Sequence, residues 1–152
     1  MASLLENFRA VVDALERAGV PFAVCGGLAM SIHARPRATI DIDLLAPPES
    51  IPRLVEAVRP IGFVSREKAP TRLSGGRIVM HRLSRIVPGD PDVLMLDVIE
   101  TGGDAAAAWR DRETVTWEGH SVPVVSRAGL ITLKRFRNSA QDQADIVALE
   151  EP

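Results

Sequence analysis

The spacing of hydrophobic residues changes along the chain, and these changes predict where helices and strands lie. From Leu4 to Leu15 hydrophobic residues recur every three or four positions, which predicts a helix over residues 4–18 that stops at Gly19. Later apolar runs are short and bounded by glycine or proline, which is typical of buried strands. The expected strands cover residues 22–25, 39–45, 62–64, 78–83, 93–99, 114–117 and 121–125. Further helices are expected over residues 27–34, 50–59, 104–112 and 126–136, with a last helix after a break at residues 138–139. Asp104 is expected to cap the helix that ends near residue 112.

Helices and strands therefore interleave, and this order predicts the α/β (α+β) class with the strands in one sheet. A tight turn at residues 118–120 joins two strands as a hairpin, which favours a mixed sheet flanked by helices over a purely parallel one. A chain of 152 residues is long enough to bury a core without disulfides. Because no repeat or long linker divides it, we expect a single domain over residues 1–152.

Composition narrows the class of protein without identifying a function. With 46% hydrophobic and 25% charged residues, the chain resembles a soluble globular protein, and its net charge of −2 argues against a protein that coats nucleic acid. Cys25 is the only cysteine, which excludes an internal disulfide and argues against a zinc cluster. No apolar run approaches the ~20 residues of a membrane span, and no signal-peptide pattern opens the chain. We therefore expect a cytoplasmic protein with no membrane partner.

Two aspartates interrupt the apolar strand over residues 39–45. Asp41 and Asp43 lie two positions apart, so their side chains point to the same face of the strand. Neighbouring carboxylates resist joint ionisation unless a cation lies between them, and Mg²⁺ or Mn²⁺ binds carboxylate oxygens together with substrate phosphates. Two solvated surface aspartates are the alternative, but aspartate is disfavoured in strands. The pair therefore predicts a divalent metal site.

Glycines and a third carboxylate extend this candidate site. Gly26 and Gly27 lead from a strand into a helix N-terminus, where backbone N–H groups favour a phosphate, although the pair also suits a tight turn alone. Asp97 stands inside another apolar strand, where a lone buried carboxylate is costly. If that strand lies beside the first, three carboxylates converge, as in two-metal sites for in-line phosphoryl transfer. These features predict a metal–nucleotide site.

The order of these residues resembles a known signature. Gly26-Gly27, a helix, Arg37-Ala38-Thr39 and then Asp41 and Asp43 resemble the nucleotidyltransferase-fold superfamily. The resemblance is closest to the small prokaryotic branch of AbiEii-type toxins and the minimal nucleotidyltransferases of toxin–antitoxin pairs. A second signature of that branch, near the C-terminus, is matched by Lys134, Arg137, Asp142 and Asp145.

The resemblance implies a role for each matching residue. Asp41, Asp43 and Asp97 would bind the metal, and Asp97 would also take the proton of the acceptor. Nucleotide and phosphate binding would fall to Gly26, Gly27, Ser31, Arg37 and Lys134; relatives often carry a serine at the position of Gly27, so backbone N–H groups or Ser31 would replace it. Thr39, Asp142 and Asp145 would support the site: Asp145 or Asp142 would hold Lys134, and Asp142 is expected to cap the last helix. The alternatives are a solvated Arg37, a solvated Lys134, and acids that only stabilise the start of a helix.

The function implied is transfer of a nucleoside monophosphate from a nucleoside triphosphate to a hydroxyl, with Mg²⁺ or Mn²⁺ as cofactor. The acceptor in the closest branch is an RNA such as a tRNA 3′ end or a partner protein, within a toxin–antitoxin system. A basic stretch over residues 66–85, with six basic residues and one acidic residue, suits either an RNA-binding wall or a solvated hairpin. Two other functions stay open: a catalytically silent binding or antitoxin module, and an antibiotic nucleotidyltransferase of the aminoglycoside or lincosamide type. A homodimer in which the second subunit presents the acceptor also fits.

Overall fold

The computed structural model describes residues 3–34 and 41–151, and its strands form one mixed sheet. The strand order is β3-β5-β6-β2-β1-β8-β7, and β4 pairs with β5. Pairing is parallel between β2 and β6 and between β1 and β8, and antiparallel elsewhere. The expected mixed sheet is therefore confirmed. The strands are β1 Ala23–Cys25, β2 Asp41–Ala46, β3 Val64–Ser65, β4 Thr71–Leu73, β5 Ile78–Ile86, β6 Val93–Glu100, β7 Glu113–Trp117 and β8 His120–Val124.

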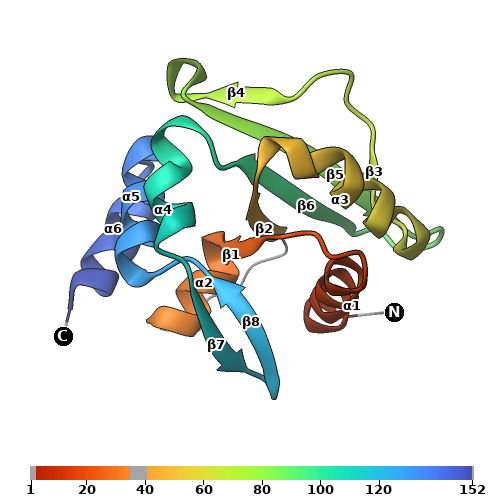
Figure 1. Ribbon diagram of the computed structural model, residues 1–152, viewed down its shortest axis with the longest axis horizontal. Coiled ribbons are helices and arrows are strands. Elements are labelled where there is room, and N and C mark those ends of the chain that lie inside the picture. The colour runs from red at the N-terminus through yellow and green to blue at the C-terminus, as the bar shows by residue number, and fades with distance from the viewer. Residues whose placement is uncertain (1–2, 35–40, 152) are drawn as a thin grey trace.

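Helices flank this sheet at both ends of the view in Figure 1. α1 and α3 lie together near the N-terminus, while α4, α5 and α6 gather near the C-terminus. The helices are α1 Leu4–Arg17, α2 Gly26–His33, α3 Ile51–Val58, α4 Ala106–Arg110, α5 Arg127–Arg137 and α6 Ala140–Glu150. Single 3₁₀ turns cover Pro48–Ser50, Arg59–Ile61, Ser74–Gly76 and Gly103–Ala105. None of the helices described is long and apolar enough to cross a lipid bilayer.

Serine side chains set the start of three helices. Ser3 accepts a hydrogen bond from the Glu6 N–H at the start of α1, and Ser126 accepts one from Gly129 at the start of α5. Ser139 forms a reciprocal capping box with Asp142 at the start of α6. The expectation that the helix near residue 104 begins at Asp104 was wrong: Ala105 precedes α4, and the preceding 3₁₀ turn directs the Asp104 carboxylate toward Arg77.

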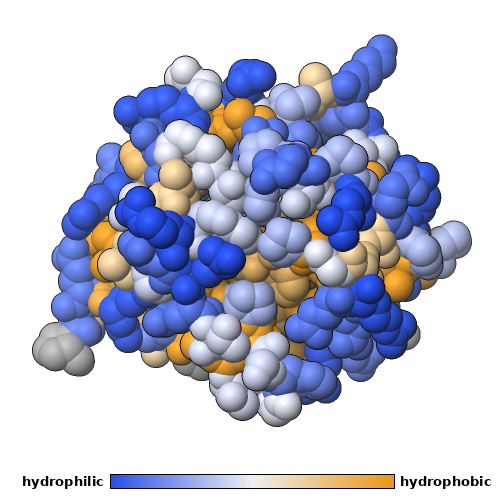
Figure 2. Space-filling model, viewed as in Figure 1, coloured by the Kyte–Doolittle hydropathy of each residue, from blue (hydrophilic) through white to orange (hydrophobic). Residues whose placement is uncertain are grey.

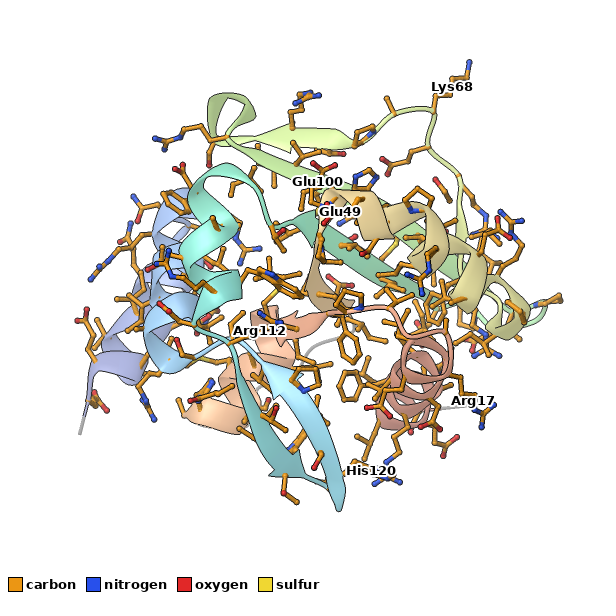
Figure 3. All side chains as sticks on the ribbon, viewed as in Figure 1. Arg17, Glu49, Lys68, Glu100, Arg112 and His120 are labelled. Carbon is orange, nitrogen blue, oxygen red and sulfur yellow. The ribbon has the colours of Figure 1, made fainter. Side chains whose placement is uncertain are left out.

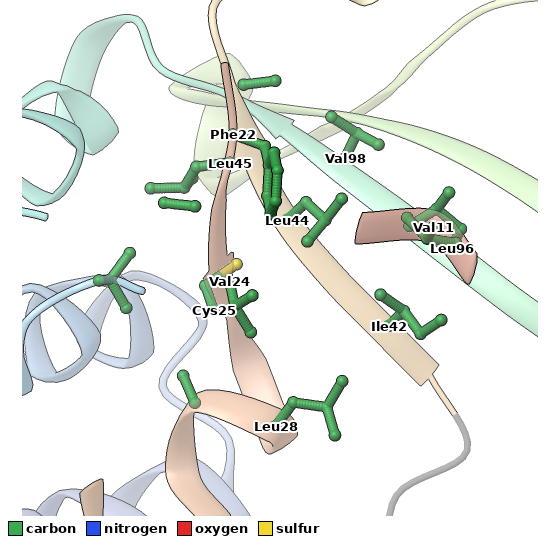
Figure 4. Packing of buried hydrophobic residues seen from close by; sticks show 14 of the residues in the cluster. Val11, Phe22, Val24, Cys25, Leu28, Ile42, Leu44, Leu45, Leu96 and Val98 are labelled. Atoms are coloured by element: carbon green, nitrogen blue, oxygen red, sulfur yellow. The ribbon is translucent and has the colours of Figure 1, made fainter. Parts of the chain in front are cut away.

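The period of two along the central strands separates a buried face from a polar one. Ile42 and Leu44 of β2 and Leu96 and Val98 of β6 are fully buried in the hydrophobic core (Figure 4). Burying such a side chain contributes roughly 1.5–3 kcal/mol. The aspartates between these residues must therefore face the opposite side of the sheet. Burial of one face thus fixes the direction of the carboxylates on the other.

The surface in the same view is mainly hydrophilic, with hydrophobic atoms exposed only in small areas (Figure 2). In the basic stretch over residues 66–85, Lys68 projects from the loop before β4 (Figure 3). Four of its arginines instead bond to other residues, three of them outside the stretch, so this stretch is not a uniformly solvated hairpin. These contacts join Arg66 to Ser84, Arg77 to Asp104, Arg82 to Asp97 and Arg85 to Asn7.

Candidate active site

A pocket of about 270 Å³ opens on the polar face of the sheet, between the central strands and α5. Its volume is near the lower end for small-molecule sites. One edge is closed by the turn between β4 and β5: the Ser74 hydroxyl donates to the Phe136 carbonyl at 2.9 Å. The charged lining residues are Asp41, Asp43, Arg82, Asp97, Lys134, Arg137 and Asp142.

A single row of paired residues crosses four strands under this pocket. Arg82 of β5 is opposite Asp97 of β6, Asp97 is opposite Asp43 of β2, and Asp43 is opposite Cys25 of β1. The predicted adjacency of the two aspartate strands is therefore present. Asp41 lies two positions before Asp43 and also lines the pocket.

Burial and mutual repulsion oppose ionisation of the aspartate pair. Burial, followed by the nearby charges of Asp97 and Asp41, raises the pKa of Asp43 to about 7. Burial and the charge of Asp97 also raise the pKa of Asp41. A cation bound between the two side chains would relieve both effects.

The donor set fits a hard divalent cation supported by a nucleotide. Mg²⁺ and Mn²⁺ in nucleotide sites are bound through one or two carboxylates and the phosphates of the substrate, and Asp41 and Asp43 supply two carboxylates. Among the described residues, no three acidic, histidine or cysteine side chains come together closely enough to hold a metal ion. Phosphate oxygens would therefore complete the coordination.

Asp97 contacts a residue that the sequence did not single out. Arg82 Nε donates to Asp97 Oδ1 at 2.8 Å, and Arg82 Nη2 donates to Asp97 Oδ2 at 2.9 Å. Asp97 itself is only 4% exposed. The available signal was the alternation of Ile78, Met80 and Arg82 along a strand. This pattern predicts the strand face on which Arg82 lies, but its contact with Asp97 depends on the register between β5 and β6.

Gly26 is required where the chain turns from β1 into α2. Its φ of +65° is a left-handed conformation that other residues rarely adopt. A Cβ at this position would lie 2.1 Å from Asp43 Oδ2, so only glycine leaves room for the carboxylate. Gly27 follows in the first turn of α2 and also lines the pocket. The glycine pair therefore serves both the turn and the placement of Asp43.

Substituting Gly26 by alanine is expected to lower both stability and activity. Left-handed backbone costs an L-residue roughly 1–2 kcal/mol, and the new methyl group must displace Asp43. Urea unfolding and a nucleotide-binding titration would measure the two effects. Gly119→Ala is a matched control, since Gly119 has φ +79° but no atom within 4 Å of its would-be Cβ. It should lose comparable stability and keep full nucleotide binding, and equal loss of binding in both variants would contradict the steric argument.

The other phosphate-binding candidates differ in position. Ser31 lies one turn into α2, where its hydroxyl donates to the Gly27 carbonyl at 3.2 Å, and it is not among the residues that line the pocket. Arg37 and Thr39 lie outside the described residues. Arg137, which matched the family signature but was given no role, lines the pocket from the last turn of α5.

Lys134 is not a solvated residue: only 5% of its side chain is exposed. Its Nζ lies 2.8 Å from Asp145 Oδ2 and 3.8 Å from Asp142 Oδ1. Gln141 donates to the other oxygen of Asp145 at 3.0 Å. Arg137 binds both oxygens of Asp142 at 2.7 Å. The helix pair α5 and α6 thus places two cations on the pocket wall and fixes both with buried carboxylates.

Asp142 is expected to stabilise the fold at neutral pH and to lose this effect in acid. Burial alone would raise its pKa, but hydrogen bonds from Arg137 and Ser139 hold the pKa well below its usual value. A lowered pKa gives stability that is present above about pH 4 and is lost as the pH falls further. Asp142→Asn should therefore cost about 1.5–3 kcal/mol at pH 7, and the difference from native should narrow below about pH 4.

Urea unfolding at pH 7, 4 and 3 measures this difference. Asp111→Asn is the control, because Asp111 forms only an exposed pair with Arg110 at 3.5 Å. Its effect should stay below about 1 kcal/mol at every pH. A constant difference between native and Asp142→Asn protein across this range would contradict the assignment.

Comparison with known families identifies the chain. The model of the aminoglycoside-2''-adenylyltransferase family matches residues 7–146, nearly the whole sequence. The chain belongs to this family. It is therefore a nucleotidyltransferase, and the superfamily expected from the sequence is confirmed. The AbiEii-type branch is not confirmed, and no curated protein matches the sequence.

Solved structures share the fold of this adenylyltransferase-family protein. A proposed nucleotidyltransferase from Thermotoga maritima superposes with a TM-score of 0.65 at 17% identity, over 92% of this chain and 90% of that one. The lincosamide antibiotic adenylyltransferase LnuA, bound to lincomycin, gives 0.63 at 14% identity, over 95% of both chains. The enzyme ANT(2'')-Ia, in complex with adenylyl-2''-tobramycin, gives 0.64 at 15% identity, over 93% and 84%.

Proposed function

We propose that this protein transfers a nucleoside monophosphate from a metal-bound nucleoside triphosphate to the hydroxyl group of a small acceptor. The observation that carries this proposal is the Asp41–Asp43 pair, held against Gly26 in a pocket that Lys134 and Arg137 also line. The name of the family favours ATP as the donor.

Each residue then has a chemical task. Asp41 and Asp43 would hold Mg²⁺ or Mn²⁺, which would neutralise negative charge on the phosphates. The backbone N–H groups at Gly26 and Gly27, with Lys134 and Arg137, would bind the β- and γ-phosphates. Asp97 would accept the proton of the acceptor hydroxyl, whose oxygen attacks the α-phosphorus as pyrophosphate leaves. Most of the rate enhancement would come from positioning and charge neutralisation.

The rest of the lining favours an acceptor with an apolar face. Leu73, Ile78, Met80, Ile99 and Phe136 line the pocket on the side of β4, β5 and the end of α5. Of the acidic lining residues, Asp97 and Asp142 are each paired with an arginine. Because arginines already neutralise these two carboxylates, a weakly charged antibiotic such as a lincosamide fits better than a polycationic aminoglycoside.

An RNA 3′ end or a partner protein is the alternative acceptor, within a toxin–antitoxin system. It would have to reach the same pocket, where a second subunit of a homodimer could present it. Two arginines of the basic stretch are already paired with carboxylates, Arg77 with Asp104 and Arg82 with Asp97, which leaves fewer charges for RNA. A catalytically silent binding module is the other alternative. It would bind its partner without transferring nucleotide, so an assay for nucleotidyl transfer distinguishes it from an enzyme.

The first test is calorimetric titration of ATP, CTP, GTP and UTP with Mg²⁺, on native protein and on Asp41→Ala/Asp43→Ala. Binding of ATP that disappears in the double variant would support the metal–nucleotide site. Asp13→Ala, at an exposed position of α1, is the control for loss of one surface charge. Transfer from α-labelled ATP to lincomycin, tobramycin or tRNA would then identify the acceptor. Well-folded native protein that binds no triphosphate would contradict the proposal.

A further inference from the structure

Asp97, the third carboxylate under the pocket, is held by an arginine. Asp97 directs both oxygens at Arg82, and the described residues contain no group of three acidic, histidine or cysteine side chains able to hold one metal ion. Two-metal sites hold their ions about 3.5–4 Å apart, and Asp97 would be the carboxylate available to the second ion here. The geometry of Asp97 instead favours a different source of positive charge.

Register makes the contact between Arg82 and Asp97 a fixed feature of the sheet. The two residues are directly opposite each other on the antiparallel strands β5 and β6. A planar guanidinium that bonds both oxygens of a carboxylate is a geometrically specific pair, which a lysine cannot reproduce. Arg82 therefore lies beside the row of carboxylates at a position set by backbone hydrogen bonds.

A second divalent ion would also have to displace this contact. Arg82 already offsets the charge of Asp97 and bonds both of its oxygens, so the ion would compete with Arg82 for them.

We propose that the pocket is a one-metal site in which Arg82 takes the place of the second cation; this inference rests on the proposed function. The two bonds to Asp97 use Nε and Nη2, so the guanidinium retains N–H donors for a second acceptor. Arg82 lines the pocket, with 38% of its side chain exposed. These remaining donors would bind the α-phosphate, where charge develops during transfer.

The test counts bound metal without turnover. Native protein saturated with a non-hydrolysable α,β-methylene analogue of ATP is titrated with Mn²⁺, and bound ion is measured by electron paramagnetic resonance. The expected count is one Mn²⁺ per native complex. Asp97→Asn, which preserves the shape of the side chain, should also bind one ion with unchanged affinity. Arg82→Gln frees the Asp97 carboxylate and should bind two.

Two further variants complete the design. Arg82→Lys retains the charge but cannot bond both oxygens of Asp97 as the guanidinium does. It should still bind one Mn²⁺ per complex, but transfer to any acceptor should be slower. Arg72→Gln removes an exposed arginine from the neighbouring strand β4 and should behave as native protein.

Three results would overturn the inference. They are two ions in the native complex, a loss of metal affinity of about tenfold or more in Asp97→Asn, and a count of one in folded Arg82→Gln. If Arg82→Gln does not fold, the number of Mn²⁺ ions bound by native protein and by Asp97→Asn still decides whether the site holds one metal ion. Failure of native protein to bind the analogue would overturn the proposed function itself and the inference with it, whereas two ions beside bound analogue would overturn the inference alone.

Discussion

Replacing Asp43 by asparagine is expected to abolish nucleotidyl transfer and to stabilise the metal-free fold. Loss of a carboxylate that would bind the metal removes several kcal/mol of transition-state stabilisation, which corresponds to a loss of about 10³-fold or more in rate. Stability should change in the opposite direction, because the pKa of Asp43 rises to about 7 in the folded protein, mainly through burial. Keeping that carboxylate ionised at pH 8 costs the folded state of the order of 2–4 kcal/mol.

The pH dependence of unfolding distinguishes stabilisation through loss of the Asp43 charge from stabilisation through better packing. Below about pH 4 the carboxyl is neutral in both the folded and the unfolded chain, so Asp43→Asn and native protein should unfold at similar urea concentrations. As the pH rises from 4 to about 7, only the native protein acquires the free-energy cost of an ionised Asp43 in the folded state. The difference in unfolding free energy between Asp43→Asn and native protein should reach its full size above that range. Asp13→Asn is the control at an exposed site and should show no such trend. A variant less stable than native protein at pH 8 would contradict the argument.

The sequence predicted the carboxylates of the site because they depend on local periodicity. The side-chain period of a strand places Asp41 and Asp43 on one face, and the cost of a lone buried carboxylate singled out Asp97. Both arguments need only a few neighbouring residues. The requirement for glycine at position 26 was recognised as a turn, but its second cause, the carboxylate of Asp43 against the backbone, is a contact across two strands.

The residues that the sequence missed depend on contacts between distant segments. Arg82 was one of several arginines in a basic stretch, and only the register of β5 against β6 pairs it with Asp97. The expected cap at Asp104 was wrong for a similar reason. Local preference favours an aspartate at a helix start, but a salt bridge to Arg77 at 3.1 Å engages the side chain elsewhere.

Lys134 illustrates what burial adds to a motif. The sequence offered two roles for it, a phosphate contact and a solvated surface residue, and nothing local could decide between them. The packing of α5 against α6 encloses its ammonium group with two carboxylates beneath the pocket. The acids of the second signature therefore have a structural reason to accompany the lysine.

Replacing Lys134 by methionine is expected to be the most destabilising single change in the site, with a cost of about 3–5 kcal/mol. Methionine matches the length of the side chain and its helix propensity, so loss of charge is the main change. Asp145, 1% exposed, would keep the hydrogen bond from Gln141 but lose the cation at 2.8 Å, and a buried carboxylate that loses its cation is costly. Urea unfolding at pH 7 measures this cost, and ATP titration of the folded fraction measures the expected loss of phosphate binding.

Two companion variants decide whether the buried pair is the cause. Arg135→Met removes the neighbouring cation of the same helix, which forms an exposed pair with Glu150 at 3.0 Å, and it should cost less than about 1 kcal/mol. Lys134→Met/Asp145→Asn removes both members of the buried pair and should recover much of the lost stability, because no carboxylate is left uncompensated at position 145. It should not recover ATP binding, since the cation stays absent. A double variant as unstable as Lys134→Met would show that packing, rather than charge, accounts for the loss.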